Sequence, residues 1–212
     1  MSGATQERPL LPILSVTFVG SLGFSIVLPF LVFVVTRLGG NALVYGALGA
    51  TYSAFQLVGA PVLGRWSDRI GRRKVLLVSQ LGTLVSWLIF LGALYLPVQT
   101  MLEVDSPLTG AFTLTLPLFV LFFARAIDGL TGGNVSVANA YLADITAEDD
   151  RNVNFGKAAV ASNLGFVFGP AIAGVLGGTA MGEVPPVLAA IAISVIASVV
   201  ILVGLPESEA CT

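Results

Sequence analysis

The sequence predicts an all-α integral membrane protein with six transmembrane helices, and two observations carry this prediction. First, 56% of the 212 residues are hydrophobic and only 10% are charged, against roughly 25% charged residues in soluble globular domains. So few charged side chains cannot cover the surface of a water-soluble core. Second, long apolar runs recur along the chain, each reaching the about 20 residues that a membrane-spanning helix needs. An ordinary soluble enzyme and a disordered chain are therefore both excluded.

The predicted spans follow one another with short connections, so the whole chain is expected to form a single transmembrane domain. The first span lacks a small-x-small cleavage site and is too long for the apolar core of a signal peptide. Runs of this length also argue against a transmembrane barrel, whose strands alternate over about ten residues. The six spans within residues 1–212 are 10–35, 42–63, 75–96, 114–142, 156–176 and 185–205.

The basic residues are distributed unevenly between the predicted connections, which predicts an orientation. Cytoplasmic connections of membrane proteins carry an excess of Lys and Arg. Of the ten basic residues, only Arg37 lies on one side, and Arg125 falls inside the fourth span. Both termini are therefore expected on the cytoplasmic side of the plasma membrane. The opposite set comprises Arg8, Arg65, Arg69, Arg72, Arg73, Lys74, Arg151 and Lys157.

Composition also limits the chemistry that this chain can perform. There is no histidine and a single cysteine, Cys211, so no internal disulfide, Cys/His metal site or haem attachment is expected. The formal net charge of -2 offers no electrostatic footprint for nucleic acid. We therefore expect a protein that is not an enzyme and carries no cofactor, and any proton chemistry must use carboxylates.

The second span carries two polar residues, Tyr52 and Gln56, at i, i+4 spacing, which places both on one helix face as candidates to line a cavity. The span ends in Gly59-Ala-Pro61-Val-Leu-Gly64, and a similar Gly169-Pro170-Ala-Ile-Ala-Gly174 lies in the fifth span. This faint repeat would relate helices 1–3 to helices 4–6 as inverted repeats, a pattern common in secondary transporters.

The connection after the second span is both basic and patterned. Its glycines permit a tight turn between two helices, its aspartate can accept hydrogen bonds from free amides at a helix N-terminus, and its arginines can pair with carboxylates or lipid phosphates. A plain basic anchor at the cytoplasmic face would explain the arginines but not Asp68. The run reads Gly64-Arg65-Trp66-Ser67-Asp68-Arg69-Ile70-Gly71-Arg72-Arg73-Lys74-Val75-Leu76.

The fourth span contains an arginine and an aspartate near its middle. An arginine at the bilayer centre should face a partner or a cavity. One interpretation is a self-neutralising ion pair between Arg125 and Asp128 at i, i+3 spacing. The other is a cavity-lining stripe in which Asp128 loads a proton or a cation. The stripe would comprise Arg125, Asp128, Gly132, Ser136 and Asn139, which are spaced by three or four residues.

The fifth span carries a seam of small residues, Gly165, Gly169, Ala173 and Gly177, which lets another helix backbone approach closely. Pro170 removes a backbone donor in the same stretch and is expected to kink the helix. Ordinary helix packing is the alternative interpretation of this seam.

These motifs together resemble the major facilitator superfamily. The connection 64–76 is similar to its signature G-x-L-a-D-R-x-G-R-(R/K)-x-x-L, with Trp66 where leucine is usual. The fourth span, through its Ala-Tyr-Leu-Ala-Asp-Ile-Thr ending at 140–146, resembles tetracycline-efflux-like drug:proton antiporters. The fifth resembles the G-x-x-x-G-P-x-x-G-G signature of antiporters, and the likeness extends to the Leu205-Pro206-Glu207 ending.

The resemblance implies the N-terminal six-helix half of a major facilitator fold and assigns roles to residues. Many drug antiporters have an aspartate where Gly20 stands, so we expect Asp128, beside Arg125, to couple protons. The conformational latch would comprise Gly64, Asp68, Arg69, Gly71, Arg72 and Arg73. The bending contact between the two halves would comprise Gly165, Gly169, Pro170, Ala173, Gly174 and Gly177. The substrate-cavity candidates are Tyr52, Gln56, Ser136 and Asn139.

The leading interpretation is proton-coupled antiport of small organic or drug-like compounds by alternating access. The family usually has twelve helices, so a lipid-embedded second half is expected, either a second copy in a homodimer or a separate C-terminal half; the chain could also be a fragment. In a homodimer, the seam would lie at the centre, and Asp68 would reach residues 154–156 of the other copy. A uniporter or symporter, and a non-transporting assembly factor or receptor, remain alternatives.

Overall fold

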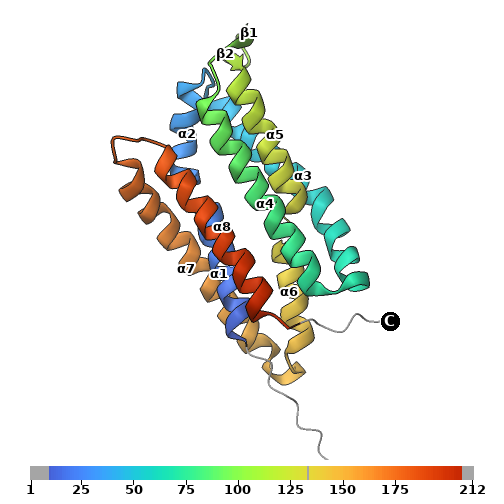
Figure 1. Ribbon diagram of the computed structural model, residues 1–212. Coiled ribbons are helices and arrows are strands. Elements are labelled where there is room, and N and C mark those ends of the chain that lie inside the picture. Colours follow the sequence, from blue (N-terminus) through green and yellow to red (C-terminus); the bar gives the residue numbers. More distant parts are fainter. Residues whose placement is uncertain (1–9, 133, 207–212) are drawn as a thin grey trace, which may run out of the picture.

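The computed structural model describes residues 10–132 and 134–206, and it is an elongated bundle of helices with one β-hairpin at its end (Figure 1). Arg8, which contributes to the predicted orientation, and Cys211, the single cysteine, both lie outside the described residues. The elements are α1 (Leu11–Ser25), α2 (Leu28–Arg37), α3 (Ala42–Ile70), α4 (Arg72–Tyr95), β1 (Thr100–Ser106), β2 (Gly110–Thr115), α5 (Leu116–Thr131), α6 (Asn134–Ile145), a 3-10 turn (Glu148–Asp150), α7 (Arg151–Gly177) and α8 (Val184–Gly204).

Within the described residues, five helical stretches are long and apolar enough to cross a membrane. The second predicted span, residues 42–63, is not among them, although it lies in the 29-residue helix α3. Polar and small residues such as Tyr52 and Gln56 lower the mean hydropathy of this stretch. The count of six membrane spans therefore remains a prediction. The five stretches are Leu11–Arg37, Arg72–Tyr95, Leu116–Ile145, Glu148–Gly177 and Val184–Gly204.

The first and fourth predicted spans are each divided into two helices. The first divides into α1 and α2 between Ser25 and Leu28, where Pro29 stands in the first turn of α2. Proline has no amide hydrogen to continue the hydrogen-bond ladder, so a break just before it is the natural outcome. The fourth ends its first helix, α5, at Thr131, with Gly132 following. The sequence predicts one span over 10–35 and one over 114–142; each is a single candidate membrane span here, built from two helical segments.

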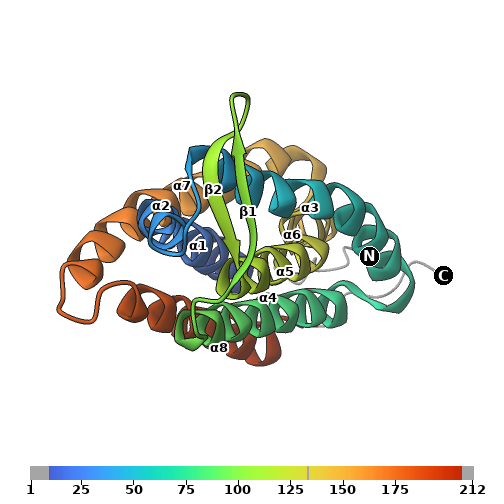
Figure 2. The same ribbon diagram turned by 90° about the horizontal axis from the view of Figure 1, so that it is seen from above.

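The third connection forms an antiparallel hairpin of β1 and β2, which the sequence does not predict. The hairpin is hydrogen bonded to the turn between α2 and α3: the Thr113 amide donates to Gly39 O at 2.8 Å. Asn41 adds a side-chain donation to Thr109 O at 2.8 Å, and the Thr115 hydroxyl donates to Leu38 O at 2.8 Å. Figure 2 shows the hairpin crossing the end of the bundle, so it ties the α2–α3 turn to the ends of α4 and α5.

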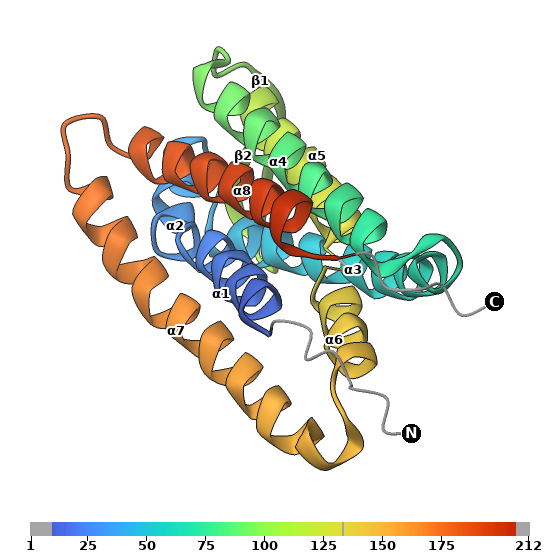
Figure 3. The ribbon, with the colours of Figure 1, turned by 60° about the horizontal axis from the view of Figure 1, so that its bottom comes forward.

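Helix α1 lies between α7 and α8, whereas α5 lies between α3 and α4 (Figure 3). Helices α4 and α8 also pack against each other. Two glycines make close approaches possible between α3 and α5: a side chain at Gly59 would overlap the Leu130 backbone, and one at Gly129 would overlap the Tyr52 backbone. These contacts bring Tyr52 next to the charged part of α5.

The small-residue seam of α7 is filled within the chain. A Cβ at Gly165 would meet the backbone of Phe18 and Leu22 on α1, and one at Gly169 would overlap Ser25. Ala173 is buried as well. The expectation that this seam lies at the centre of a dimer is therefore wrong for Gly165 and Gly169, because α1 of the same chain occupies their face.

The remaining seam residues have other surroundings. Pro170 and Gly174 are exposed, and a Cβ at Gly174 would meet nothing within 4 Å. Gly177 lies near Pro186 at the start of α8, where an added Cβ would be 3.9 Å from the proline ring. Helix α7 continues through Pro170 from Arg151 to Gly177 without a break. One face of α7 is thus an internal contact, and the opposite face is open.

Candidate functional site

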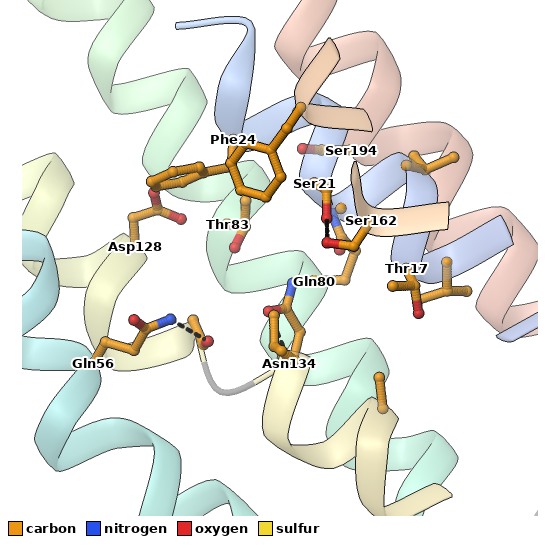
Figure 4. Close-up of a pocket in the computed structure, with 18 of the residues that line it drawn as sticks. Thr17, Ser21, Phe24, Gln56, Gln80, Thr83, Asp128, Asn134, Ser162 and Ser194 are labelled. Atoms are coloured by element: carbon orange, nitrogen blue, oxygen red, sulfur yellow. Dashed lines mark hydrogen bonds between the residues drawn. The ribbon is translucent and has the colours of Figure 1, made fainter. Parts of the chain in front are cut away.

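A cavity of about 330 Å³ lies in the middle of the bundle, enclosed by α1, α3, α4, α5, α6, α7 and α8 (Figure 4). Its wall combines aromatic rings with uncharged hydroxyl and amide groups. Among the described residues that line it, Asp128 is the only charged one. A mostly apolar cavity with a few convergent polar groups is typical of a small-molecule site.

Arg125 and Asp128 form the buried ion pair that their i, i+3 spacing predicts. The Arg125 Nη1 donates to Asp128 Oδ2 at 3.2 Å, and the two side chains are 2% and 5% exposed. Asp128 faces the cavity, whereas Arg125 lies behind it. The pair and the cavity are thus both present, so neither of the two interpretations excludes the other.

The Arg125 guanidinium is held in an aromatic cage. Its central carbon lies 5.9 Å from the ring centroid of Phe24, 5.3 Å from that of Tyr52 and 5.8 Å from that of Trp87. Ring faces attract a cation, which helps to compensate the desolvation of a buried arginine. Its Nε has no hydrogen-bond partner in the described part of the chain. The cage therefore keeps a fixed positive charge next to Asp128.

Tyr52 and Gln56 both line the cavity, as their spacing on the second span predicts. Gln56 Nε2 donates to the Tyr52 hydroxyl at 3.1 Å and to Gly132 O at 2.9 Å. The Ser79 hydroxyl donates to Thr131 O. Carbonyls at the end of a broken helix need such partners in an apolar environment. These two residues of α3 and α4 therefore satisfy the backbone where α5 ends.

The stripe predicted on the fourth span is only partly formed. Gly132 and Asn139 line the cavity, but Ser136 does not. Ser136 is exposed and lies beside Gly64 of α3, where an added Cβ would be 4.0 Å from its hydroxyl. The three- and four-residue spacing assumes one continuous helix, whereas α5 ends at Thr131 and α6 begins at Asn134. The prediction that Ser136 lines the substrate cavity is therefore not supported by the structure.

Sequence reasoning missed the contribution of α4 to the cavity. Gln80, Thr83 and Trp87 line it, and their i, i+3, i+7 spacing is a helical signal that was available. Thr83 faces the cavity together with Asp128 (Figure 4). Asn134, at the start of α6, was missed as well because its neighbourhood depends on the helix break.

Two further contributors come from helices that are distant in the sequence. The hydroxyls of Ser21 on α1 and Ser162 on α7 are hydrogen bonded at 2.7 Å (Figure 4). The rings of Phe24 and Phe166 lie edge to face, with centroids 6.1 Å apart. Nothing in the local pattern of either helix indicates these pairings, since they follow from the α1–α7 contact.

The residues of the predicted latch gather where α3 meets α4. Gly71 has a φ of 102°, a conformation that favours glycine, and it makes the tight turn possible. Arg72 Nη1 lies 2.5 Å from Asp68 Oδ1, and Arg72 Nε donates to Asp144 Oδ2 at 2.9 Å. Arg72 thus joins the end of α3 to the end of α6. Asp68 was expected to reach a second copy, yet here its partner is in its own chain.

The other latch arginines have different partners. Arg73 donates to Leu202 O near the end of α8. Arg69 is exposed on α3, beside Arg65, Trp66 and Val62 around a shallow hollow. The arginines of this connection therefore hold three helix ends together and leave one basic face open.

Replacing Arg72 with lysine is expected to loosen the latch, because a lysine ammonium cannot bridge two carboxylates with a planar fork. If this connection closes one end of the bundle, as the resemblance implies, we expect the open form to gain roughly fivefold in population, the scale of about 1 kcal/mol for partly exposed pairs. Labelling of Asn139→Cys by an impermeant maleimide, with Cys211→Ser, measures it. The matched control is Arg65→Lys, because the Arg65 side chain donates to Pro61 O of its own helix. Equal labelling rates in both variants would contradict the latch.

Comparison with known proteins places these features in context. The model of the family described as the Major Facilitator Superfamily matches residues 13–211. Tetracycline resistance protein class E of Escherichia coli is 33% identical over 175 residues, covering 81% of this chain and 38% of that protein. Tetracycline resistance protein class D of Salmonella ordonez is 33% identical over 189 residues, covering 88% and 42% respectively.

Two further matches extend over nearly the whole chain. Multidrug resistance protein 2 of Bacillus subtilis is 29% identical over 206 residues, which cover 96% of this chain and 45% of that protein. The crystal structure of the human organic anion transporter MFSD10 (TETRAN) superposes with a TM-score of 0.70 at 21% identity, covering 97% of this chain and 49% of that one. The chain therefore spans less than half the length of these relatives, and the structural match shows the fold alone.

Proposed function

Because the chain belongs to the Major Facilitator Superfamily, whose members are membrane transporters and not enzymes, we propose that it exports small organic or drug-like compounds in exchange for protons. It would act by alternating access, together with a second six-helix half. Several of its relatives are named for resistance to tetracycline or to multiple drugs, which supports this substrate class.

The observation that carries the proposal is a single carboxylate, Asp128, that faces the cavity with a caged arginine behind it. Ionised Asp128 neutralises Arg125, and protonated Asp128 leaves its positive charge uncompensated. The net charge of the pair therefore alternates between zero and plus one. Charges interact strongly in such an apolar setting, so a cationic compound would bind the unprotonated form better. Competition between proton and substrate for one site is the basis of antiport.

The same electrostatics supports a second candidate, proton-coupled symport of an organic anion. An anion would bind the protonated site, where Arg125 is uncompensated and its Nε lacks a partner. The structural relative named as an organic anion transporter is consistent with such a substrate. We favour antiport because Arg125 lies behind Asp128 and does not line the cavity in the described part of the chain. A cation can therefore reach the carboxylate more directly than an anion can reach the guanidinium.

Helix pairing supports the proposed 3+3 inverted repeat. If α1–α2 corresponds to α5–α6, α3 to α7 and α4 to α8, the main contacts of α1 correspond to those of α5. The contact of α1 with α7 corresponds to that of α5 with α3, and the contact of α1 with α8 corresponds to that of α5 with α4. Both first members of the repeat are also divided helices.

The bundle exposes apolar faces that the proposed second half could cover. Helix α3 exposes Leu57 and Val58, at 79% and 61%, and α7 exposes Val167 and Val175, at 66% and 77%. These faces suit lipid or another helix bundle. This chain spans less than half the length of these relatives, so the rest of the fold would come from a second copy, a separate C-terminal half or a longer protein of which this sequence is a part.

The experiment uses the full chain in liposomes that contain a pH-sensitive dye. Tetracycline and tetraphenylphosphonium serve as probes, with protein-free liposomes as the control. Addition of a probe under an imposed pH gradient should move protons opposite to the probe, and a protonophore should abolish its uphill accumulation. Proton movement in the same direction as the probe would favour symport. Probe movement without protons would favour a uniporter, and no probe movement would contradict a transporter of these compounds.

The mass of the solubilised particle tests the assembly. Two chains per particle, with transport, would support a homodimer. Transport that appears only after a separate six-helix partner is added would support a split transporter. A particle with one chain that transports alone would contradict the need for a second half.

A further inference from the structure

Two carboxamide side chains face the cavity with hydrogen-bonding atoms that no protein group uses. Gln80 on α4 is only 3% exposed, and among the described residues neither end of its amide has a hydrogen-bond partner. On α6, Asn134 Oδ1 accepts from the Val135 amide at 2.8 Å, which leaves the nitrogen of its side chain for the cavity. Both side chains are drawn in Figure 4. Neither amide atom of Gln80 is among the fully buried unpaired polar atoms of the described residues, so both are accessible to water or to a ligand in the cavity.

Gln80 is not required to dock α4 on its neighbour. Ser79 donates to Thr131 O, and Ser86 donates to Ala124 O at 2.7 Å, so the serines of α4 already bind α5. Gly82 lies directly against Thr131 as well. Other residues thus position α4, and the Gln80 side chain can form hydrogen bonds with a ligand in the cavity.

The rest of the cavity supplies a contrasting surface. The rings of Phe24, Tyr52 and Trp87 surround the buried guanidinium of Arg125 and also line the cavity. Aromatic walls hold a flat apolar compound through large contact areas. Such walls accept many compounds, whereas a carboxamide discriminates by offering one donor group and one acceptor at fixed positions.

We propose that Gln80, assisted by Asn134, determines which compounds are bound, by pairing with an uncharged group that offers both a donor and an acceptor. A carboxamide, or an enol beside a ketone, is the substrate chemistry that fits, and the aromatic walls hold the attached rings. This inference rests on the proposed transport function. It adds a residue that determines specificity and the chemical group of the substrate with which that residue forms hydrogen bonds. Sites built to bind such groups strongly reject analogues that lack them.

The protein contains its own reporter for the test. The chain has two tryptophans, of which Trp87 is buried in the cavity wall and Trp66 is exposed on α3. In a Trp66→Phe background, Trp87 fluorescence reports tetracycline in the cavity of the full chain in nanodiscs. Tetracycline carries a carboxamide and several enol and ketone groups. Tetraphenylphosphonium has rings but no hydrogen-bonding group, and its binding is measured by equilibrium dialysis.

Gln80→Leu should raise the Kd for tetracycline about tenfold and leave that for tetraphenylphosphonium within about twofold. The unliganded variant should melt at the same temperature as its parent or higher, because the substitution removes no hydrogen bond to another protein group and places an apolar side chain at a buried position. Gln99→Leu, an exposed glutamine outside the cavity, is the matched control and should change neither Kd.

The outcomes separate the two proposals. An unchanged Kd for tetracycline in Gln80→Leu, or an equal rise for both probes, would overturn the role of Gln80 while leaving the cavity as a binding site. If neither probe binds the parent protein, both this inference and the proposed drug-transport function fail. Selective loss of tetracycline binding, without loss of thermal stability, supports the inference.

Discussion

Replacing Asp128 with asparagine is expected to abolish proton-driven uphill transport while preserving exchange of one substrate molecule for another. Asparagine keeps the shape and the hydrogen-bonding capacity of the side chain but cannot take up a proton. The site would then remain at a single charge, with Arg125 uncompensated. Probe accumulation under a pH gradient should fall to the level of protein-free liposomes, and counterflow of labelled against unlabelled probe should continue.

The stability of this variant must be measured beside its transport. Removing one partner of a buried ion pair costs about 3–5 kcal/mol when the remaining charge stays buried, although the three rings around Arg125 lessen this cost. The double variant Asp128→Asn, Arg125→Gln removes both charges and should recover much of the lost stability without recovering proton coupling. Asp105→Asn on the exposed hairpin is the matched control. Uphill accumulation that persists in a folded Asp128→Asn variant would exclude Asp128 as the coupling group.

The sequence was informative about Asp128 because its signal is local. A charged residue inside an apolar span is costly, and two such residues one helical turn apart predict a pair whatever the rest of the fold does. Tyr52 and Gln56 were found for the same reason, as polar groups on one face of an apolar stretch. Both predictions depend only on spacing within one helix. They therefore hold even if the span boundaries are misplaced or the neighbouring helices are unknown.

Features that depend on breaks or on distant contacts were not predictable in this way. Where α6 begins after α5, Asn134 lines the cavity and Ser136 does not. Pro29 was a visible signal for the division between α1 and α2, but Gly132 alone is a weak one because glycine is common in membrane helices. The hairpin gave only a brief alternation in Leu102-Glu103-Val104-Asp105, too short to separate a strand from a loop.

The seam of α7 illustrates a different limit. Small residues at four-residue spacing predict that some backbone approaches closely, and α1 does so at Gly165 and Gly169. The spacing does not say which backbone it is. A second copy and a helix of the same chain satisfy the pattern equally well, so the choice between them required the arrangement of all the helices.

Replacing Gly169 with leucine is therefore expected to destabilise the six-helix bundle itself. The first carbon of the new side chain would overlap the Ser25 hydroxyl and press on the backbone amide of Ile26, the residue that caps the end of α1. Backbone atoms cannot give way as a flexible side chain can, so α7 must move away from α1. Overpacking of this kind costs about 1–3 kcal/mol or more, and the Ser25 donation to Gly165 O at 2.9 Å would be strained as well. Thermal melting followed by size-exclusion chromatography measures the loss.

Gly174 on the same helix provides the matched control, and it also tests the second half. An added Cβ there meets nothing within 4 Å, so Gly174→Leu should leave the melting temperature of the isolated bundle almost unchanged. If the exposed face of α7 packs against a second half, however, the same substitution should separate the two halves and reduce transport. A loss of stability equal to that of Gly169→Leu would contradict the packing described for α7. If stability, particle mass and transport are all unchanged, the exposed face of α7 contacts lipid. The second half would then pack elsewhere on the bundle.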